Sequence, residues 1–485
     1  MSANFYAHIA VTLRAAPATA LLTWPALTLA ESGSDYVPPT YHTGAEIAAA
    51  VAAMRKRLTA AGVQPGQRVL LLVPVSFELI GALLGGLAHG AVVVLPPVKS
   101  SPAQLLRLAR RGQVAAVVLA QAPGFAMKLL GQLFGLKLVG ANELTSHFPE
   151  LPPAAVLPTQ PALITHTSGS TGQPKQIVRT HAVLSAQHAV LKQIFPPWPG
   201  QRDFPLFPNV LLHNLASGAA SILPKVPWGN FADFYPPLVV EQLRDFEVQT
   251  LTGNVFYFQK LLPELQRQPG GFPLVRALGV GGSPVPEWLG QALRAVFPRA
   301  TIYVIYGSSE AEPIAVRPLT TRAESPALGY AVGPVHPSLE LQLEALGELE
   351  LPGGERRPVG EIRVRGPHVA SPAPGGWLRT GDFGYLAADG QLYLTGRAGN
   401  EALRHGVQHY QLEHVLQHLP DVVRVAARPV TAGFAVYVQG EATETAIRSA
   451  LAAHFPAAVC ADVHFRAELP VDHRHHSKIR YAELR

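Results

Sequence analysis

The sequence predicts an α/β fold: a large N-terminal domain of parallel sheets flanked by helices, with a small β-barrel-like subdomain, followed by a small α+β C-terminal domain. Three observations predict it. Short β-branched runs alternate with longer helical patterns from residue 41 to about residue 307. Shorter strands between Gly/Pro turns take over after about residue 330, and a helix-and-strand region begins near Gly399. The first pattern is typical of βαβ units, and the second indicates an antiparallel or barrel-like sheet.

The elements of the first half follow from this alternation. We expect a helix at 44–62, a strand at 68–74, a helix at 76–90 and a strand at 91–97, then strands at 114–120, 161–168, 248–254, 275–282 and 301–307. A helical pattern at 181–195 falls between two of these strands. Helices between short, β-branched strands predict a parallel sheet with helices on both faces.

The second half predicts two smaller parts. Strands at 347–353, 359–367 and 390–397 form the β-rich subdomain of about residues 330–396, and they are followed by a helix at 411–420, strands at 422–430 and 434–440, a helix at 442–455 and a basic tail. The last region has the size of a separate domain. We therefore expect domain boundaries that give residues 1–396 and 397–485.

Composition bounds the function. The chain has 485 residues, of which 48% are hydrophobic and 15% are charged, so it is globular and not disordered. Its net charge of +6 is scattered, without a run of five basic residues, which argues against nucleic acid and modestly favours anionic small ligands. One cysteine, Cys460, excludes an internal disulfide framework and a thiolate zinc cluster, and it indicates a reducing compartment, by default the cytoplasm.

Two apolar stretches resemble membrane or export elements. Residues 69–95 are interrupted by Pro74, Glu78 and His89, so we interpret them as strand, helix and strand and expect no membrane span. The N-terminus lacks a basic segment followed by an uninterrupted apolar core, so no secretory signal is expected.

The segment ITHTSGSTGQPKQIVRTH, residues 164–181, concentrates hydrogen-bond donors. Gly169 and Gly172 free backbone N–H groups, and the side chains of Thr167, Ser168, Ser170, Thr171 and Lys175 add hydroxyls and a cation. This pattern predicts a phosphate cradle. Pro174 and Gln176 around the lysine exclude a Walker A motif, and the strand before and the helix after exclude a flexible linker.

Five stretches together resemble the adenylate-forming superfamily, the AMP-dependent ligases that include acyl-CoA synthetases, peptide-synthetase adenylation domains and luciferases. They are TSGSTGQPK, LGVGGSPVP at 278–286, YGSSEAEP at 306–313, WLRTGDFGYLAADGQLYLTGR at 377–397 and the tail with Lys478. The tail PVDHRHHSKI, with FPLF at 204–207, resembles in particular the olefin-pathway β-lactone synthetase branch. The resemblance covers nearly the whole chain and implies a mobile C-terminal domain.

The resemblance also implies roles for single residues. The loop residues and Lys175 would bind the phosphates of ATP, and Tyr306 would stack on adenine. The further nucleotide-binding residues would be Gly282, Ser283, Pro284, Gly307, Ser308, Ser309, Asp382 and Arg397. Asp382 would accept hydrogen bonds from both ribose hydroxyls.

The catalytic candidates are Glu310 and Lys478. Glu310 would ligate Mg²⁺ on the ATP phosphates, as a hard oxygen ligand for a hard cation. Lys478 would neutralise charge in the attack of a carboxylate on the α-phosphorus. Outside these motifs each candidate has a plain structural alternative: a core tyrosine, a solvated glutamate, a turn aspartate, a surface arginine or a solvated lysine in the tail.

The sequence departs from the family pattern at several places. Gln176 follows the loop lysine where glycine is usual, Asn209 lies where a histidine is common, and Asn400 lies at the hinge where Asp or Lys is common. The segment 366–377 is short, and Tyr481 occupies an arginine position. In the tail, HRHHS at 473–477 could suggest a metal, but neighbours on an extended tail rarely converge on one ion, so added positive charge near phosphate is the favoured interpretation.

Three functions remain open. The first is ATP- and Mg²⁺-dependent adenylation of a carboxylic acid, a fatty or other acyl acid, with release of pyrophosphate, followed by transfer to CoA or to the phosphopantetheine of an acyl carrier protein. The second is β-lactone closure of an adenylated β-hydroxy acid by its own hydroxyl. The third is a non-catalytic nucleotide-binding scaffold. Residues 211–224 could line an acyl pocket or belong to the core, and the sequence determines neither the acid nor the oligomeric state.

Overall fold

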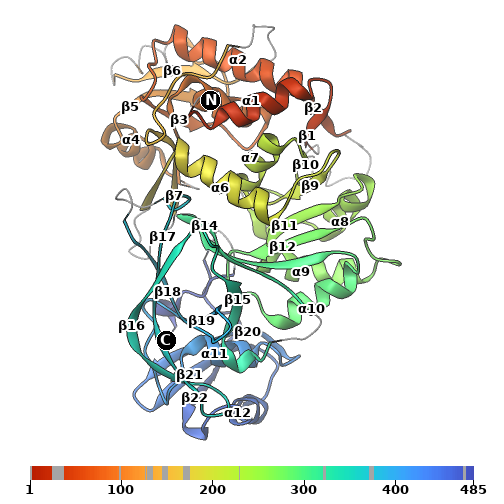
Figure 1. Cartoon of the computed structure of the whole chain (residues 1–485), viewed down its shortest axis with the longest axis vertical. Coiled ribbons are helices and arrows are strands. Elements are labelled where there is room, and N and C mark those ends of the chain that lie inside the picture. The colour runs from red at the N-terminus through yellow and green to blue at the C-terminus, as the bar shows by residue number, and fades with distance from the viewer. Residues whose placement is uncertain are drawn as a thin grey trace. The chain divides into compact units, whose positions relative to one another are not determined.

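A computed structural model of the chain describes residues 3–24, 38–97, 100–125, 127, 131, 135–144, 151–167, 175–228, 230–320, 324–370, 376–472 and 477–484. The chain forms two compact units, Met1–Phe234 with Pro367–Pro374, and Tyr235–Gly366 with Gly375–Arg485 (Figure 1). The boundary that we expect at residue 397 falls within the second unit and stays a prediction.

The first unit is built around a sheet of order β6-β5-β3-β4-β7-β8. Its strands are β3 (Arg68–Leu72), β4 (Val92–Val94), β5 (Val114–Leu119), β6 (Lys137–Gly140), β7 (Pro161–Thr167) and β8 (Lys175–Thr180). All pairs are parallel except β7 with β8. The helices here are α1 (Tyr6–Ala15), α2 (Gly44–Ala60), α3 (Phe77–His89), α4 (Pro102–Arg111) and α6 (His181–Ile194).

A second group of strands in this unit has the order β9-β10-β1-β2. It comprises β1 (Ala20–Trp24), β2 (Thr40–Thr43), β9 (Arg202–Pro205) and β10 (Ala220–Ile222), with helix α7 (Pro208–Ser217). The apolar stretch 69–95 is β3, α3 and β4, which confirms the strand, helix and strand expected there. In the described part of the chain, no helix has the length and apolarity that a bilayer crossing needs.

Close packing of α2 on α3 explains the glycines of the apolar stretch. A Cβ on Gly85 would lie 2.6 Å from the Cβ of Met54, so only glycine lets the two helices approach this closely. Helix α2 begins at a capping box in which Thr43 and Glu46 exchange side-chain and backbone hydrogen bonds. The interface is part of a core that includes Ile9, Ile47 and Leu84, all fully buried.

The second unit begins with parallel strands. They are β11 (Thr250–Asn254), β12 (Ala277–Gly281) and β13 (Thr301–Ser308), followed by the antiparallel β14 (Ala311–Pro318). The helices α8 (Pro236–Asp245), α9 (Val255–Gln266) and α10 (Glu287–Val296) accompany them. Adjacent parallel strands bring their carboxyl ends to one edge of the sheet, which positions the loops after β12 and β13 side by side.

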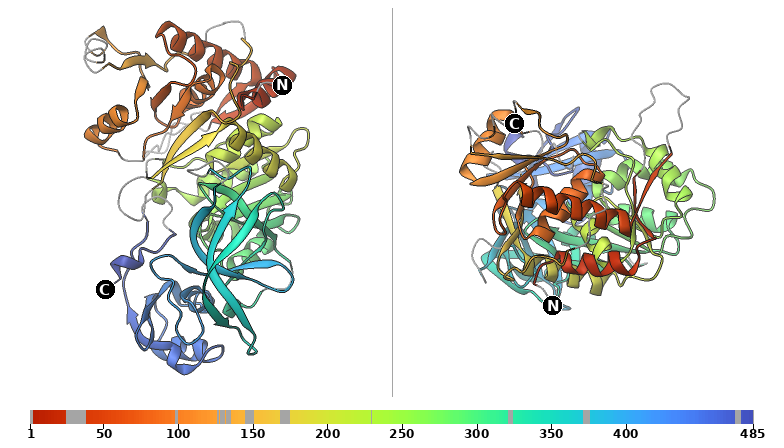
Figure 2. Two further views of the ribbon diagram at one scale, coloured as in Figure 1. Left: turned by 60° about the vertical axis from the view of Figure 1, so that its left-hand side comes forward. Right: turned by 90° about the horizontal axis from the view of Figure 1, so that it is seen from above.

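An antiparallel sheet follows, of order β15-β19-β18-β17-β16 (Figure 2). Its strands are β15 (Tyr330–Pro334), β16 (Glu340–Glu350), β17 (Arg356–Arg365), β18 (Leu378–Leu386) and β19 (Gln391–Arg397). The chain then forms α11 (His409–Leu416), β20 (Val422–Val430), β21 (Gly433–Gly440), α12 (Glu444–Ala452) and β22 (Cys460–Phe465). Short 3₁₀ turns are η1 (Phe231–Asp233), η2 (Pro326–Leu328), η3 (Ala457–Val459) and η4 (Tyr481–Glu483).

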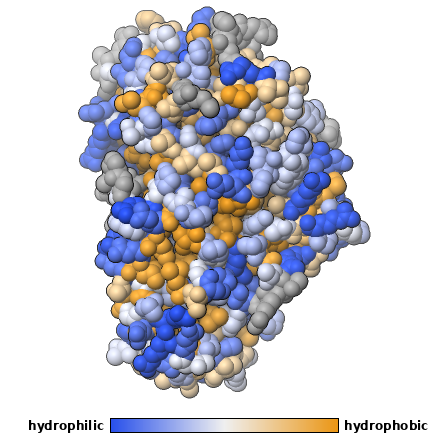
Figure 3. Space-filling model, viewed as in Figure 1, coloured by the Kyte–Doolittle hydropathy of each residue, from blue (hydrophilic) through white to orange (hydrophobic). Residues whose placement is uncertain are grey.

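The predicted fold class is confirmed: parallel sheets with helices come first, then an antiparallel sheet, then a small α+β region. On the face shown in Figure 3, hydrophilic residues are spread among apolar ones.

Candidate active site

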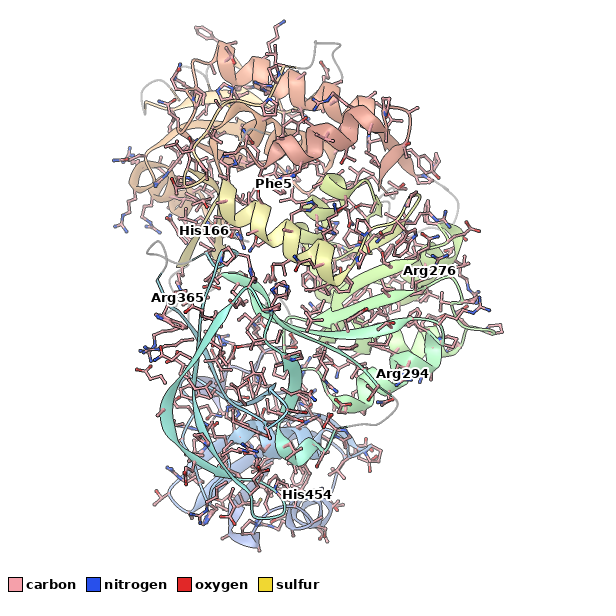
Figure 4. All side chains as sticks on the ribbon, viewed as in Figure 1. Phe5, His166, Arg276, Arg294, Arg365 and His454 are labelled. Carbon is pink, nitrogen blue, oxygen red and sulfur yellow. The ribbon has the colours of Figure 1, made fainter. Side chains whose placement is uncertain are left out.

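The predicted phosphate loop joins two antiparallel strands of the first unit. Thr167 and Lys175 are register partners at the ends of β7 and β8, and Lys175 has an exposed side chain. His166, labelled in Figure 4, lies next to the loop, and its Nδ1 is 2.7 Å from the carbonyl oxygen of Leu95. Ser168, Gly169, Ser170, Thr171, Gly172 and the side chain of Thr167 lie outside the described residues. Their phosphate-binding role stays a prediction.

The second unit brings the predicted adenine-side residues together. Gly281 and Ile305 are register partners on β12 and β13, so Gly282–Pro284, just after β12, and Tyr306, near the end of β13, lie at the same edge of the sheet. Gly282 has φ 80°, a conformation that favours glycine. The Oγ of Ser283 is buried without a hydrogen-bond partner among the described residues. Leaving a buried hydroxyl unpaired costs about 1–3 kcal/mol, so a ligand atom that pairs with it would gain affinity.

Tyr306 and Asp382 are hydrogen-bonded. Tyr306 is 7% exposed, and its phenol donates to Oδ2 of Asp382 at 3.0 Å. Burial and the charge of Asp382 raise the pKa of Tyr306 well above its usual value, so the phenol stays protonated and donates. Each carboxylate oxygen accepts more than one hydrogen bond, so Asp382 keeps acceptor capacity for hydroxyls of a ligand.

The segment Thr380-Gly381-Asp382 is held by its own hydrogen bonds. The Thr380 hydroxyl donates to the carbonyl of Ile362 at 2.8 Å and accepts from the N–H of Asp382 at 3.0 Å. Gly381 has φ 72° between them. Arg397 is the register partner of Asp382, and its Nη1 donates to Oδ1 at 2.5 Å and to the Thr380 carbonyl at 3.2 Å. The negative charge of Asp382 raises the pKa of Arg397, which stays a cation.

Lys478 lies in a short braced segment of the tail. Its backbone N–H donates to Oδ1 of Asp472 at 3.0 Å, and the N–H of Asp472 donates to its carbonyl at 2.9 Å. Val471 and Ile479 form the adjoining β-bridge. Lys478 is exposed as a residue, yet desolvation at its ammonium and then the charge of Arg397 lower its pKa, while Asp382, Asp472 and Glu310 act in the opposite direction. The ammonium therefore lies among the site's other charged groups.

In the described part of the second unit, hydrogen bonds thus join three predicted residues, Tyr306, Asp382 and Arg397, and the charges of Asp382, Arg397 and Glu310 act on Lys478. Gly307 and Ser308 end β13, while Ser309 and Glu310 form the turn before β14. A Cβ on Gly307 would lie 2.7 Å from the carbonyl oxygen of Ala311, so this turn requires glycine. The phosphate loop and Lys175 belong to the first unit.

Several departures from the family pattern have definite places. Gln176 lies exposed on β8, and Asn209 lies at the start of α7. Asn400 is 3% exposed, and its Nδ2 donates to the carbonyl of Ala427 at 2.8 Å. Within 366–377, His368 is fully buried in the first unit, where its carbonyl accepts from Gln187.

The stretch 211–224 supplies core residues, since Leu212, Leu215 and Leu223 belong to the buried cluster of the first unit. An acyl pocket beside it stays a prediction.

Sequence reasoning missed the residues that support the site. Asp472, six residues before Lys478, accepts a hydrogen bond from the backbone N–H of Lys478. The Thr380 hydroxyl accepts one from the backbone N–H of Asp382. An aspartate shortly before the tail lysine was the available signal for the first. Among the described residues, no group of three histidine, cysteine or acidic side chains could hold a metal, and 473–476 lie outside that part of the chain.

Comparison with known proteins shows the family to which the chain is similar. Residues 24–372 match the model of a family described as AMP-binding enzyme. The olefin beta-lactone synthetase of Xanthomonas campestris pv. campestris is 30% identical over 66% of this chain. The chain covers 65% of the length of that relative, which is less than two thirds.

Other similar proteins carry ligase names. The 2-succinylbenzoate–CoA ligase of Geobacillus kaustophilus is 29% identical, over 78% of each chain. The O-succinylbenzoate coenzyme A synthetase of Bacillus subtilis, solved in complex with AMP, superposes with a TM-score of 0.75 at 19% identity, covering 98% of this chain and 97% of the other. The last comparison shows that the fold is shared.

Proposed function

Because the chain belongs to the family of AMP-binding enzymes, we propose that it activates a fatty or other acyl carboxylic acid with ATP, forming an acyl-adenylate and releasing pyrophosphate. The observation that carries this proposal is the convergence of Tyr306, Asp382 and Arg397 with Lys478 in one unit. The matching relatives named as CoA ligases support it.

Adenylation of a carboxylate needs a positive charge near the α-phosphate of ATP. A carboxylate that attacks the α-phosphorus is repelled by the phosphate oxygens, and negative charge is spread over these oxygens in the transition state. A cation already in position stabilises that charge without reorganisation. Lys478 would supply it, while Asp382 would hold the ribose and Tyr306 the adenine.

The nucleotide and its metal fit the residues present. The unpaired Ser283 hydroxyl and the remaining acceptor capacity of Asp382 suit a nucleoside. Glu310 offers a hard oxygen ligand in the turn after β13, which suits Mg²⁺. When bound, Mg²⁺ would neutralise charge on the triphosphate.

The acyl acceptor has two candidates. The CoA-ligase relatives favour a thiol, of CoA or of the phosphopantetheine on an acyl carrier protein. The olefin beta-lactone synthetase relative favours an internal hydroxyl, whose attack on the adenylated carbonyl closes a β-lactone and releases AMP. Intramolecular attack gains a large effective molarity and needs no thiol. We place the reaction in a reducing compartment, by default the cytoplasm, because the chain has one cysteine.

A panel of carboxylic acids, including β-hydroxy fatty acids, tests the function by pyrophosphate release from ATP with and without CoA. Release that depends on an acid supports adenylation. Acyl-CoA as product identifies the ligase, whereas lactone plus AMP without CoA identifies the second candidate. No acid-dependent release across the panel would contradict the proposal and favour a non-catalytic nucleotide-binding scaffold.

A further inference from the structure

A buried carboxylate outside the nucleotide site collects hydrogen bonds from three parts of the chain. Glu413, on α11, is 3% exposed. The Tyr481 hydroxyl lies 2.9 Å from both of its oxygens, and Oε1 also accepts the N–H of Ala427 at 2.8 Å. His409 Nδ1 lies 3.0 Å from the same oxygen. Glu413 therefore joins the tail, β20 and α11.

The network continues to the nucleotide site through His409. The backbone N–H of Arg397 donates to His409 Nε2 at 3.0 Å. Because Nε2 accepts this hydrogen bond, Nδ1 carries the ring proton. Nδ1 therefore donates a hydrogen bond to the Glu413 carboxylate. Arg397 in turn holds Asp382 through its guanidinium. An unbroken series of hydrogen bonds and one ion pair thus runs from Tyr481 to Asp382.

Tyr481 lies only three residues after Lys478, so the same network fixes the tail. Ile479 and Tyr481 pack against a buried cluster that includes Tyr437 and Leu484. The Tyr481 ring meets the His409 ring edge-on, with centroids 4.8 Å apart. The ring of Tyr481 therefore contacts His409, which binds the backbone of Arg397, and its hydroxyl contacts Glu413, which binds His409.

We propose that Glu413 and Tyr481 are positioning residues that tie the Lys478 tail to Arg397, and so set where the ammonium stands relative to a nucleotide held by Asp382. The inference rests on the proposed function, because it assigns Lys478 its task. Neither residue touches a reacting atom. A displacement of about 1 Å in a catalytic group can lower a rate about 100-fold, so a loosened tail has a measurable cost.

The test compares Tyr481→Phe with Tyr385→Phe. Tyr481 is partly buried, whereas Tyr385 of the same unit is buried, and the Tyr385 hydroxyl donates to the carbonyl of Leu328 at 3.1 Å, outside the network. Tyr481→Phe should lower kcat for acid-dependent pyrophosphate release about 10-fold or more with KM for ATP nearly unchanged, because a misplaced cation affects the transition state more than ground-state binding. Tyr385→Phe should leave kcat unchanged, and thermal unfolding shows that both variants fold.

A second measurement follows the tail directly. Amide hydrogen exchange of residues 477–484 should be faster in Tyr481→Phe than in the wild type and unchanged in Tyr385→Phe. Wild-type kcat in Tyr481→Phe would overturn the positioning role, whether or not exchange changes.

The two proposals fail differently. If the wild type is active, Lys478→Ala is inactive and Tyr481→Phe matches its control, only this inference fails. If the wild type releases no pyrophosphate with any acid, the proposed function fails and the role given to Lys478 fails with it. Tail exchange then still reports whether Tyr481 holds the tail.

Discussion

Asp382 and Arg397 lie opposite each other on β18 and β19, and Nη1 of the arginine donates to Oδ1 of the aspartate at 2.5 Å. The backbone N–H of the same arginine donates to His409, at the start of α11. One residue thus connects the carboxylate assigned to the ribose with the helix that supports the tail.

The first prediction concerns the Asp382 carboxylate. Asp382→Asn keeps the side-chain shape but removes the charge that strengthens hydrogen bonds to ribose hydroxyls. Hydrogen bonds to charged groups contribute about 1.5–3 kcal/mol, so AMP should bind about 10- to 100-fold more weakly in calorimetry. Asp389→Asn, in the exposed turn before β19, is the control and should bind AMP like the wild type. Equal affinity in both variants would refute the ribose assignment.

The second prediction concerns the pH dependence of activity. Lys478 is exposed as a residue, but desolvation at its ammonium and the charge of Arg397 lower its pKa, so the ammonium loses its proton at a lower pH than an ordinary lysine does. Since the charged form is needed, activity should fall on the alkaline side, beginning below the pH at which ordinary lysines titrate. Lys478→Arg should be slower but should lack this alkaline decline, because a guanidinium stays charged. The same decline of activity at alkaline pH in the wild type and in Lys478→Arg would assign that decline to another titrating group.

The third prediction concerns acid stability of the first unit. His188 and His213 are buried with their Nδ1 atoms 3.0 Å apart. Burial, with repulsion from the charges of His213, His8 and Lys192, lowers the pKa of His188 to about 3. Burial also lowers the pKa of His213 to about 4.

The folded state holds both rings neutral, so the unfolded state binds more protons once the pH is below 6.5, the ordinary histidine pKa. The contribution of the two neutral histidines to the free energy of unfolding is complete above pH 6.5. It is lost as the pH falls towards about 4 and then about 3. The slope is at most about 1.4 kcal/mol per pH unit for each histidine. Urea unfolding of His213→Gln should show a weaker pH dependence than the wild type, and an equal dependence would place the acid sensitivity elsewhere.

The fourth prediction concerns a buried ion pair in the second unit. Arg317 and Glu287 are paired with side chains 8% and 1% exposed. Removing one partner leaves an uncompensated buried charge, so Arg317→Leu should destabilise the protein by about 3–5 kcal/mol in urea unfolding. Replacing both residues by leucine should recover much of that loss. A double variant no more stable than Arg317→Leu would contradict this account.

The helices and strands that the sequence predicts most clearly are those with one strong pattern. The 69–95 stretch becomes β3, α3 and β4 because its proline, glutamate and histidine interrupt a run that could otherwise span a membrane. Strand β8 was not predicted, because Lys175, Gln176 and Arg179 carry no apolar signal. Its pairing with β7 comes from the hairpin, which local composition does not reveal.

The helix α11 shows why supporting residues escape sequence analysis. It carries the polar residues His409, Gln411, Glu413 and His414, yet every residue of α11 is buried. Their partners come from distant positions, such as Ala327 for Gln411 and Gly329 for His414. Motif residues were predictable because their types match a known chemistry, whereas these pairings depend on the folded chain.

Transfer of isotope from the acid to AMP tests the central claim most directly. With an active acid labelled with ¹⁸O in its carboxylate, attack on the α-phosphorus leaves one labelled oxygen in AMP after the acyl group has passed to its acceptor. The account predicts AMP with a single ¹⁸O and unlabelled pyrophosphate, and loss of this product in Lys478→Ala. Unlabelled AMP, or label in released phosphate, would show that no acyl-adenylate forms.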